Sequence, residues 1–177
     1  MPNWVGTSWN VTLPTDKVKR FLNYFLTSDK VDQLRGRYLY RTFIAEDSID
    51  TVETQPGITS LSFFANSAWS LESILVERDP DEKGICRCPC LDWVCKDCSV
   101  IDLKAKGDEP MMGFREFIEW DPDNGLSHDA EDVTIWSCDE CNTMGYWEDE
   151  DPDADRNVCP ACGHKFEEDK DEEDKVV

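Results

Sequence analysis

Four cysteines near the C-terminus have the spacing of a metal site. Cys138 and Cys141 form one C-x2-C pair, Cys159 and Cys162 form another, and 17 residues separate the pairs. A structural zinc ion takes four thiolates in a tetrahedron, and each C-x2-C turn supplies two of them. The spacing therefore predicts a Zn2+ site, and four thiolates leave no open position for catalysis. The alternative is two pairs of thiols that are buried or free.

The residues around these pairs predict a zinc ribbon. Gly163 directly follows the second pair, where the turn is expected to need a positive φ that glycine adopts without steric penalty. Strand-like stretches flank the pairs: "VTIWS" leads into the first, "MGYWE" leaves it, and "HKF" follows the second. So small a β unit lacks a core of its own, so the metal would stabilise its fold directly.

Five more cysteines lie in the stretch "CRCPCLDWVCKDC". Cys95 and Cys98 are three residues apart and would share one face of a helix, while Cys86 and Cys88 lie on the incoming loop. These four can complete a second zinc site, and Cys90 can replace a loop ligand, so spacing alone does not choose between the sets. The alternative is that Cys95 and Cys98 are small core residues and the loop thiols are free, because this spacing matches no common zinc template.

The composition indicates a folded protein of a reducing compartment. The chain has 177 residues, 40% of them hydrophobic, which suits one ordinary domain and a small appendage. No apolar run approaches the length of about 18 residues that a membrane helix needs, and the N-terminus lacks the pattern of a secretory signal. We therefore expect a cytoplasmic protein without membrane contact, in which nine cysteines fit metal thiolates better than disulfides.

The charge is strongly negative and uneven. The formal net charge is −21, and residues 1–45 carry seven Lys and Arg against three Asp and Glu, so residues 46–177 carry −25. An acidic surface repels phosphate and favours basic protein partners, although such charge also serves solubility alone.

A basic and aromatic section near the N-terminus favours a different partner. Exposed aromatic side chains on a sheet can stack nucleic-acid bases, although packing with a solvated rim is the alternative. The section consists of Lys17, Lys19, Arg20, Arg35, Arg37, Tyr38, Tyr40 and Arg41.

Hydrophobic periodicity predicts an α+β fold. The expected elements are a strand over 9–13, a helix after Thr15 with its buried stripe ending at Leu26, strands over 37–46 and 57–66, a helix over 91–98 and a strand over 100–105. Residues 47–56 are expected to be a polar connection. The order βαββαβ is that of a ferredoxin-like split βαβ sandwich, with two helices on one face of an antiparallel sheet. "MGFREFIEW" adds an extra strand before the turn "DPDNG".

These elements divide the chain into three parts. Residues 1–130 are expected to form the ferredoxin-like domain with a Cys-rich insertion, and residues 131–166 the zinc ribbon. Residues 167–177 have too few apolar groups to offset chain entropy, so a disordered acidic tail is expected.

Several short motifs in residues 1–126 resemble a known family. They are "MPNW", the strand and helix that follow it, "FFANSAWS" at residues 63–70, and "EPMMGFREFIEW" followed by "DPDNG". Together they resemble the YubB-type ferredoxin-like family of phages and conjugative plasmids. The resemblance implies a ferredoxin-like core, an origin on a mobile genetic element of a bacterial host, and structural roles for Trp69 and Phe114. It implies no particular activity.

Two functional hypotheses follow. The common nucleotide-binding, protease and hydrolase motifs are absent from the sequence, so we expect no enzyme. The first hypothesis is a zinc-binding interaction protein of a phage or plasmid that binds and inhibits a host protein with a basic surface, such as a nucleic-acid-processing or defence factor. The second is a nucleic-acid-binding zinc-ribbon regulatory protein, which the acidic residues around the ribbon disfavour.

Overall fold

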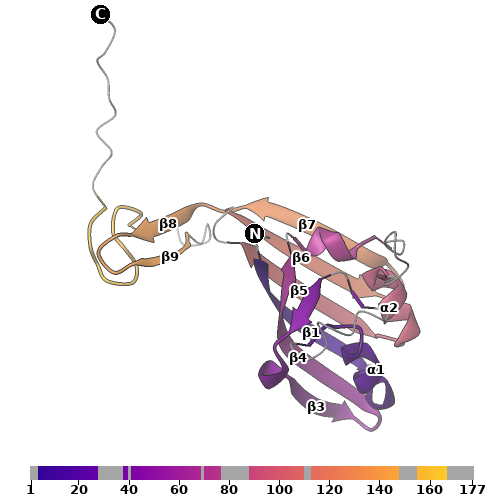
Figure 1. Cartoon of the computed structure of the whole chain (residues 1–177). Coiled ribbons are helices and arrows are strands. Elements are labelled where there is room, and N and C mark those ends of the chain that lie inside the picture. Colours follow the sequence, from indigo (N-terminus) through magenta and orange to yellow (C-terminus); the bar gives the residue numbers. More distant parts are fainter. Residues whose placement is uncertain are drawn as a thin grey trace, which may run out of the picture. The chain divides into compact units, whose positions relative to one another are not determined.

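The chain divides into two compact units (Figure 1). The computed structural model describes residues 4–27, 38–39, 41–68, 70–76, 88–109, 113–147 and 155–166. The first unit, here called the sheet unit, comprises residues 1–109 and 114–131. The second, here called the cysteine unit, comprises residues 110–113 and 132–177.

An antiparallel sheet of seven strands makes up most of the sheet unit. The strand order is β2–β4–β1–β5–β6–β7, and β3 pairs with β4 on the same side as β2. The strands are β1 (Trp4–Pro14), β2 (Thr42–Ile44), β3 (Asp50–Gln55), β4 (Ile58–Ala68), β5 (Asp102–Glu109), β6 (Phe114–Asp121) and β7 (Gly125–Asp132). Short helical elements connect them: η1 (Thr15–Lys17), α1 (Val18–Leu22), η3 (Glu46–Ser48), η4 (Leu71–Ile74) and α2 (Leu91–Asp97).

The core lies on one face of this sheet. Successive residues of a strand point to opposite faces, and the alternate residues Trp9, Val11 and Leu13 of β1 are buried. Trp9 stacks on Phe63 of the neighbouring β4, with ring centroids 5.7 Å apart. Both α1 and α2 contribute buried residues to the same hydrophobic cluster, so the two helices cover the same face of the sheet (Figure 1).

One carboxylate joins the two helices. Asp97 at the end of α2 accepts two hydrogen bonds of 2.6 Å from the guanidinium of Arg20 and one of 2.6 Å from the hydroxyl of Tyr24. This paired arrangement holds α2 against α1 and over the core.

The predicted ferredoxin-like split βαβ sandwich is wrong. The sheet has seven strands, and the two α-helices of the described residues span only five and seven residues. The predicted first helix stops at Leu22, and Leu26 forms a bridge with Phe43 instead. Phe25 and Leu26 are still buried, at 0% and 5% exposure. The apolar spacing therefore predicted the burial of Phe25 and Leu26 correctly. It did not predict their backbone conformation, because Leu26 pairs with Phe43 and the helix does not continue.

Two exposed edge strands account for the rest of the difference. β3 lies inside the segment predicted to be a polar connection, and all of its residues are exposed. β7 forms the other edge and is almost as exposed. A strand without a buried face shows no apolar alternation, so periodicity could not detect either one. Among the described residues of the strand predicted over 37–46, only β2 is a strand, and Glu46 already begins η3.

The other predicted elements of the sheet unit have clear counterparts. β4, β5, β6 and α2 lie where strands and a helix were expected. Trp69 and the tail of residues 167–177 lie outside the described residues, and Phe114 begins β6. The helices in the described part of the chain are all too short to span a lipid bilayer.

Candidate metal centre

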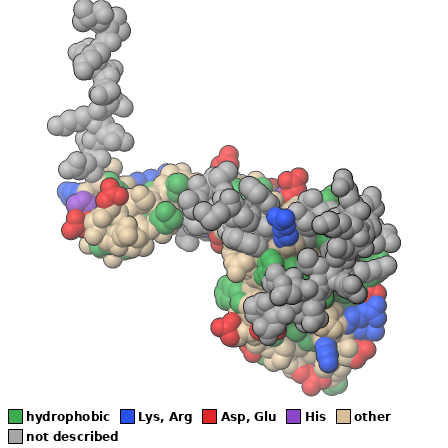
Figure 2. All heavy atoms as spheres, viewed as in Figure 1, with side chains coloured by type: hydrophobic (Ala, Val, Ile, Leu, Met, Phe, Trp, Pro, Cys, Tyr) green, Lys and Arg blue, Asp and Glu red, His purple; other side chains and the backbone are tan. Residues whose placement is uncertain are grey.

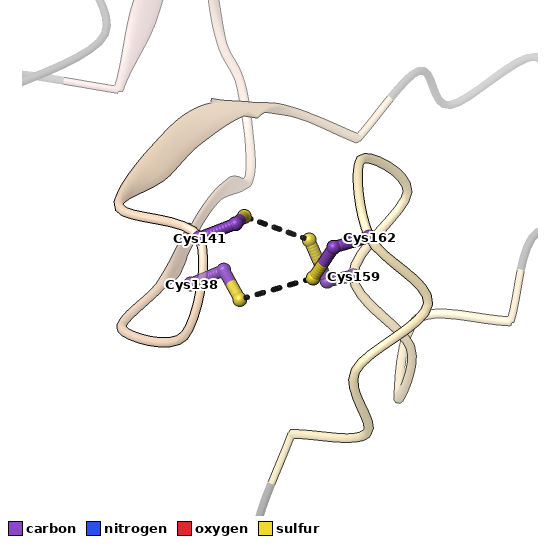
Figure 3. A group of neighbouring side chains, drawn as sticks. All are labelled: Cys138, Cys141, Cys159 and Cys162. Carbon is purple, nitrogen blue, oxygen red and sulfur yellow. Dashed lines mark hydrogen bonds between the residues drawn. The ribbon is translucent and has the colours of Figure 1, made fainter.

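The cysteine unit brings its four cysteines together. A short hairpin of β8 (Ile135–Cys138) and β9 (Thr143–Tyr146) places Cys138 and Cys141 at its turn. Cys159 and Cys162 lie in a second turn, closed by a bridge between Val158 and Lys165. Figure 3 shows the two pairs facing each other with their sulfur atoms directed inward.

The sulfur atoms have the separations of a tetrahedral site. All four lie within 4.8 Å of one another. The Sγ atoms of Cys138 and Cys162 are 3.7 Å apart, and those of Cys141 and Cys159 are 3.8 Å apart. A tetrahedron with metal–sulfur bonds of about 2.3 Å has sulfur–sulfur edges of about 3.8 Å. A disulfide needs only about 2.05 Å, so the arrangement fits four ligands around one ion. The predicted ligand set can hold a metal ion.

Both turns have the same backbone design. Gly163, one residue after the second pair, has a φ of 75°, as predicted, and its N–H donates to the carbonyl of Cys159 at 2.9 Å. Asn142 occupies the equivalent place after the first pair, with a φ of 56° and a hydrogen bond of 2.8 Å to the carbonyl of Cys138. Asparagine is the residue other than glycine that best tolerates this conformation, so Asn142 was a readable signal that the sequence analysis missed.

The thiols of Cys141 and Cys162 have pKa values shifted in opposite directions. The pKa of Cys141 is lowered to about 6, first of all by a side-chain hydrogen bond with Thr143. The pKa of Cys162 is raised to about 12, because partial desolvation and hydrogen bonds with the neighbouring thiols outweigh a lowering hydrogen bond from the backbone of His164. The raised pKa of Cys162 favours its neutral thiol form in the absence of a cation. A bound divalent ion would stabilise all four thiolates together.

A small aromatic cluster supports the site. Trp147 is 8% exposed and packs against Trp136 and Phe166, with ring centroids 6.2 and 6.3 Å apart. Gly145 leaves room for this packing, since a Cβ there would lie 2.8 Å from the ring of Trp136. Three rings are a very small core, so a metal ion held by the four cysteines would supply much of the order.

The second group of cysteines has a different environment. Cys95 and Cys98 lie on and just after α2, are fully buried, and belong to the hydrophobic core of the sheet unit. Burial raises the pKa of Cys95 far above its usual range and raises that of Cys98 to about 11. Cys88 is buried and Cys90 is half-buried.

Within the described residues, only the four cysteines of the cysteine unit form a group that could hold a metal ion. Cys86 lies outside those residues, so the second zinc site of Cys86, Cys88, Cys95 and Cys98, with Cys90 as a replacement, stays a prediction.

Comparisons of the chain with protein-family models, with curated proteins and with solved structures find no match. The resemblance to the YubB-type family therefore also stays a prediction.

Proposed function

We propose that the protein is a non-enzymatic, zinc-binding interaction protein of a phage or plasmid, which acts in the cytoplasm of the bacterial host and binds a host protein with a basic surface. Zinc is the proposed ion because a closed tetrahedron of four thiolates is a common structural zinc site. The ion would fold the cysteine unit, and carboxylates of the sheet unit would make the contact.

The main observation behind this proposal is that most described basic side chains of the sheet unit form ion pairs within the protein. Six of the eight Lys and Arg side chains in the described part of the sheet unit lie in ion pairs with the protein's own carboxylates. Arg20, central to the predicted nucleic-acid section, is held by Asp97 in a bidentate pair. Arg35, Arg37 and Tyr40 of that section lie outside the described residues. Paired cations attract phosphate weakly, so the arrangement favours a protein partner over nucleic acid.

Three carboxylates at one sheet edge have no such partner in the part of the chain that the structure describes. No Lys or Arg occurs between Arg41 and Arg78. Glu46, Asp47 and Asp50 of η3 and β3 are exposed, and none forms an ion pair with a described residue. In Figure 2, acidic side chains appear at several places on the visible surface, while Lys and Arg side chains appear at fewer. Unpaired carboxylates of this kind attract a basic surface.

Affinity capture followed by reconstitution tests the proposed partner. Zinc-loaded protein would be used to capture proteins from host lysate at low salt, and a captured protein would be purified and titrated by calorimetry at two salt concentrations. We expect a basic protein whose affinity falls as salt rises, because the attraction is between charged surfaces. The variant Glu46→Gln/Asp47→Asn/Asp50→Asn should weaken binding.

A matched variant controls for total charge. Asp123→Asn/Asp129→Asn/Glu131→Gln removes the same charge near β7, at the opposite edge of the sheet, and should leave the affinity unchanged. Equal weakening by both variants, or no captured basic protein, would contradict the proposal. A salt-sensitive mobility shift of duplex DNA would favour the nucleic-acid-binding alternative instead.

Metal analysis tests the proposed ion separately. Purified protein should contain one zinc per chain. Iron also suits four thiolates, so visible absorbance and iron content would identify that outcome.

A further inference from the structure

A groove with an apolar floor lies on the sheet unit between α1 and the segment formed by η3 and β3. Its volume is about 480 Å³. Val18, Leu22, Ile44 and Ile49 form the apolar part of its lining. Val18, Leu22 and Ile49 are only partly buried and pack against the margin of the core. The floor therefore keeps apolar surface that a further apolar group would remove from water.

Among the described residues, the buried hydroxyl of Thr27 at the groove has no hydrogen-bond partner. Thr27 is 6% exposed, and no described residue exchanges a hydrogen bond with its side chain. By contrast, the hydroxyls of Thr15 and Thr59, which also line the groove, are 2.9 Å apart and satisfy each other. A buried hydroxyl without a partner is costly, so Thr27 is suited to a polar group that enters the groove.

The two walls of the groove differ in charge. Glu46 lines the groove from η3, with Asp47 beside it, while α1 contributes Lys19. Thr51 also lines the groove, and its cross-strand partner is the buried Leu61, so it lies on the helix-covered face of the sheet. A cation bound in the groove is therefore expected on the η3 side, and Lys19 disfavours a ligand that is positive throughout.

We propose that this groove binds an extended basic segment of the partner protein, with a large apolar side chain on the floor, a main-chain polar group at Thr27 and a Lys or Arg beside Glu46. This inference rests on the proposed function and names the place of contact. An extended peptide fits because its main chain supplies both hydrogen-bonding groups and alternating side chains.

Two labelled peptides test the proposal on the full-length, zinc-loaded protein. Both carry the same Lys and Arg residues, and one has Phe at its centre where the other has Ser. Fluorescence anisotropy should show the Phe peptide binding about tenfold tighter or more, because only Phe covers the apolar floor. Thr27→Val should weaken both peptides about threefold to tenfold, since it removes the hydroxyl and keeps the side-chain volume.

A pair of tryptophan substitutions locates the binding. Thr51→Trp places a bulky ring in the groove and should abolish the preference for the Phe peptide. Val52→Trp places the same ring on the opposite face of β3 and should leave it intact, since Val52 lies opposite Ser60 and is 55% exposed. Circular dichroism and thermal melting would verify that both variants fold.

The outcomes separate this inference from the proposed function. Equal affinity for both peptides, or a preference that survives Thr51→Trp, would overturn the groove as the site. The proposed function would survive that result if binding still weakened with salt and with Glu46→Gln/Asp47→Asn/Asp50→Asn. Absence of binding by either peptide at low salt would overturn the groove, and the capture experiment would then decide the proposed function alone.

Discussion

Two cysteine pairs with the same spacing lie in different structural environments in this protein. Cys95 and Cys98 have the C-x2-C spacing in the sheet unit, and Cys138 and Cys141 have it in the cysteine unit. The first pair lies on and just after a helix that packs on a sheet, and its thiols are part of a hydrophobic core. The second pair lies at a hairpin turn and meets two more sulfur atoms at tetrahedral distances.

The difference shows that spacing is only one of the requirements for a metal site. A turn with a residue of positive φ directs two sulfur atoms to one side, as Asn142 and Gly163 do. A helix of the same spacing can instead direct two thiols at the core, where burial favours the neutral form.

Loss of one ligand should unfold the cysteine unit alone. Cys159→Ser removes a thiolate that is 1% exposed, and structural zinc sites contribute roughly 10–16 kcal/mol of apparent binding free energy to folding. We expect loss of the metal and of ordered NMR signals from Trp136 and Trp147, with an unchanged sheet unit. A chelator should reproduce the effect, whereas Cys95→Ala should retain the metal. An ordered cysteine unit without metal would contradict the structural role of the ion.

A polar substitution in the core should affect only the sheet unit. Cys95→Ser places a hydroxyl in an apolar site and should lower the free energy of unfolding by about 1–3 kcal/mol, with Cys95→Ala costing less. Urea denaturation measures the change, and metal analysis of the same samples should show no loss. A fall of one metal ion per chain would instead support the predicted second site with Cys86, Cys88 and Cys98.

The backbone of the second turn should tune metal affinity. Gly163→Ala forces a side chain into the left-handed conformation at a cost of about 1–2 kcal/mol, which corresponds to a roughly fivefold to thirtyfold weaker affinity. Competition with a chromogenic chelator measures this affinity. Gly163→Asn should weaken the site less, and Asn142→Gly should have almost no effect. Equal losses for alanine and asparagine would show that the turn does not depend on φ.

The smallest effect concerns the network that holds α2 in place. The Tyr24 hydroxyl, together with Arg20, holds the pKa of Asp97 below its usual value, while burial raises the pKa of Tyr24 to about 12. Tyr24→Phe should lower the free energy of unfolding at pH 7 by at most about 1 kcal/mol, because solvent screens this partly exposed pair.

The pH dependence of that effect follows from the signs of the two shifts. The Asp97 contribution is present above its unfolded pKa of about 3.9 and is lost as the pH falls through the lower folded value. The Tyr24 contribution is present below about pH 10 and is lost as the pH rises towards 12. Urea denaturation at pH 7 and near pH 3 should show the two proteins converging in acid. A constant difference would exclude Asp97 as the cause.

The cluster of four cysteines could be predicted from the sequence because it depends on short-range chemistry. Four thiolates at the end of two tight turns need only local backbone geometry and one ion, and Gly163 marked one of those turns. The buried residues of α1 and of the turn after it could also be predicted. Apolar spacing indicates which residues are buried even where the backbone is not helical.

Tertiary structure decided the remaining features. β3 and β7 are extended because they form hydrogen bonds with neighbouring strands. Their exposed side chains show no pattern from which this pairing could be predicted. Long-range packing likewise ended the first helix at Leu22, placed Cys95 and Cys98 in a core, and formed the groove at Thr27. Each of these depends on segments far apart in the chain, so no local pattern of residues could specify it.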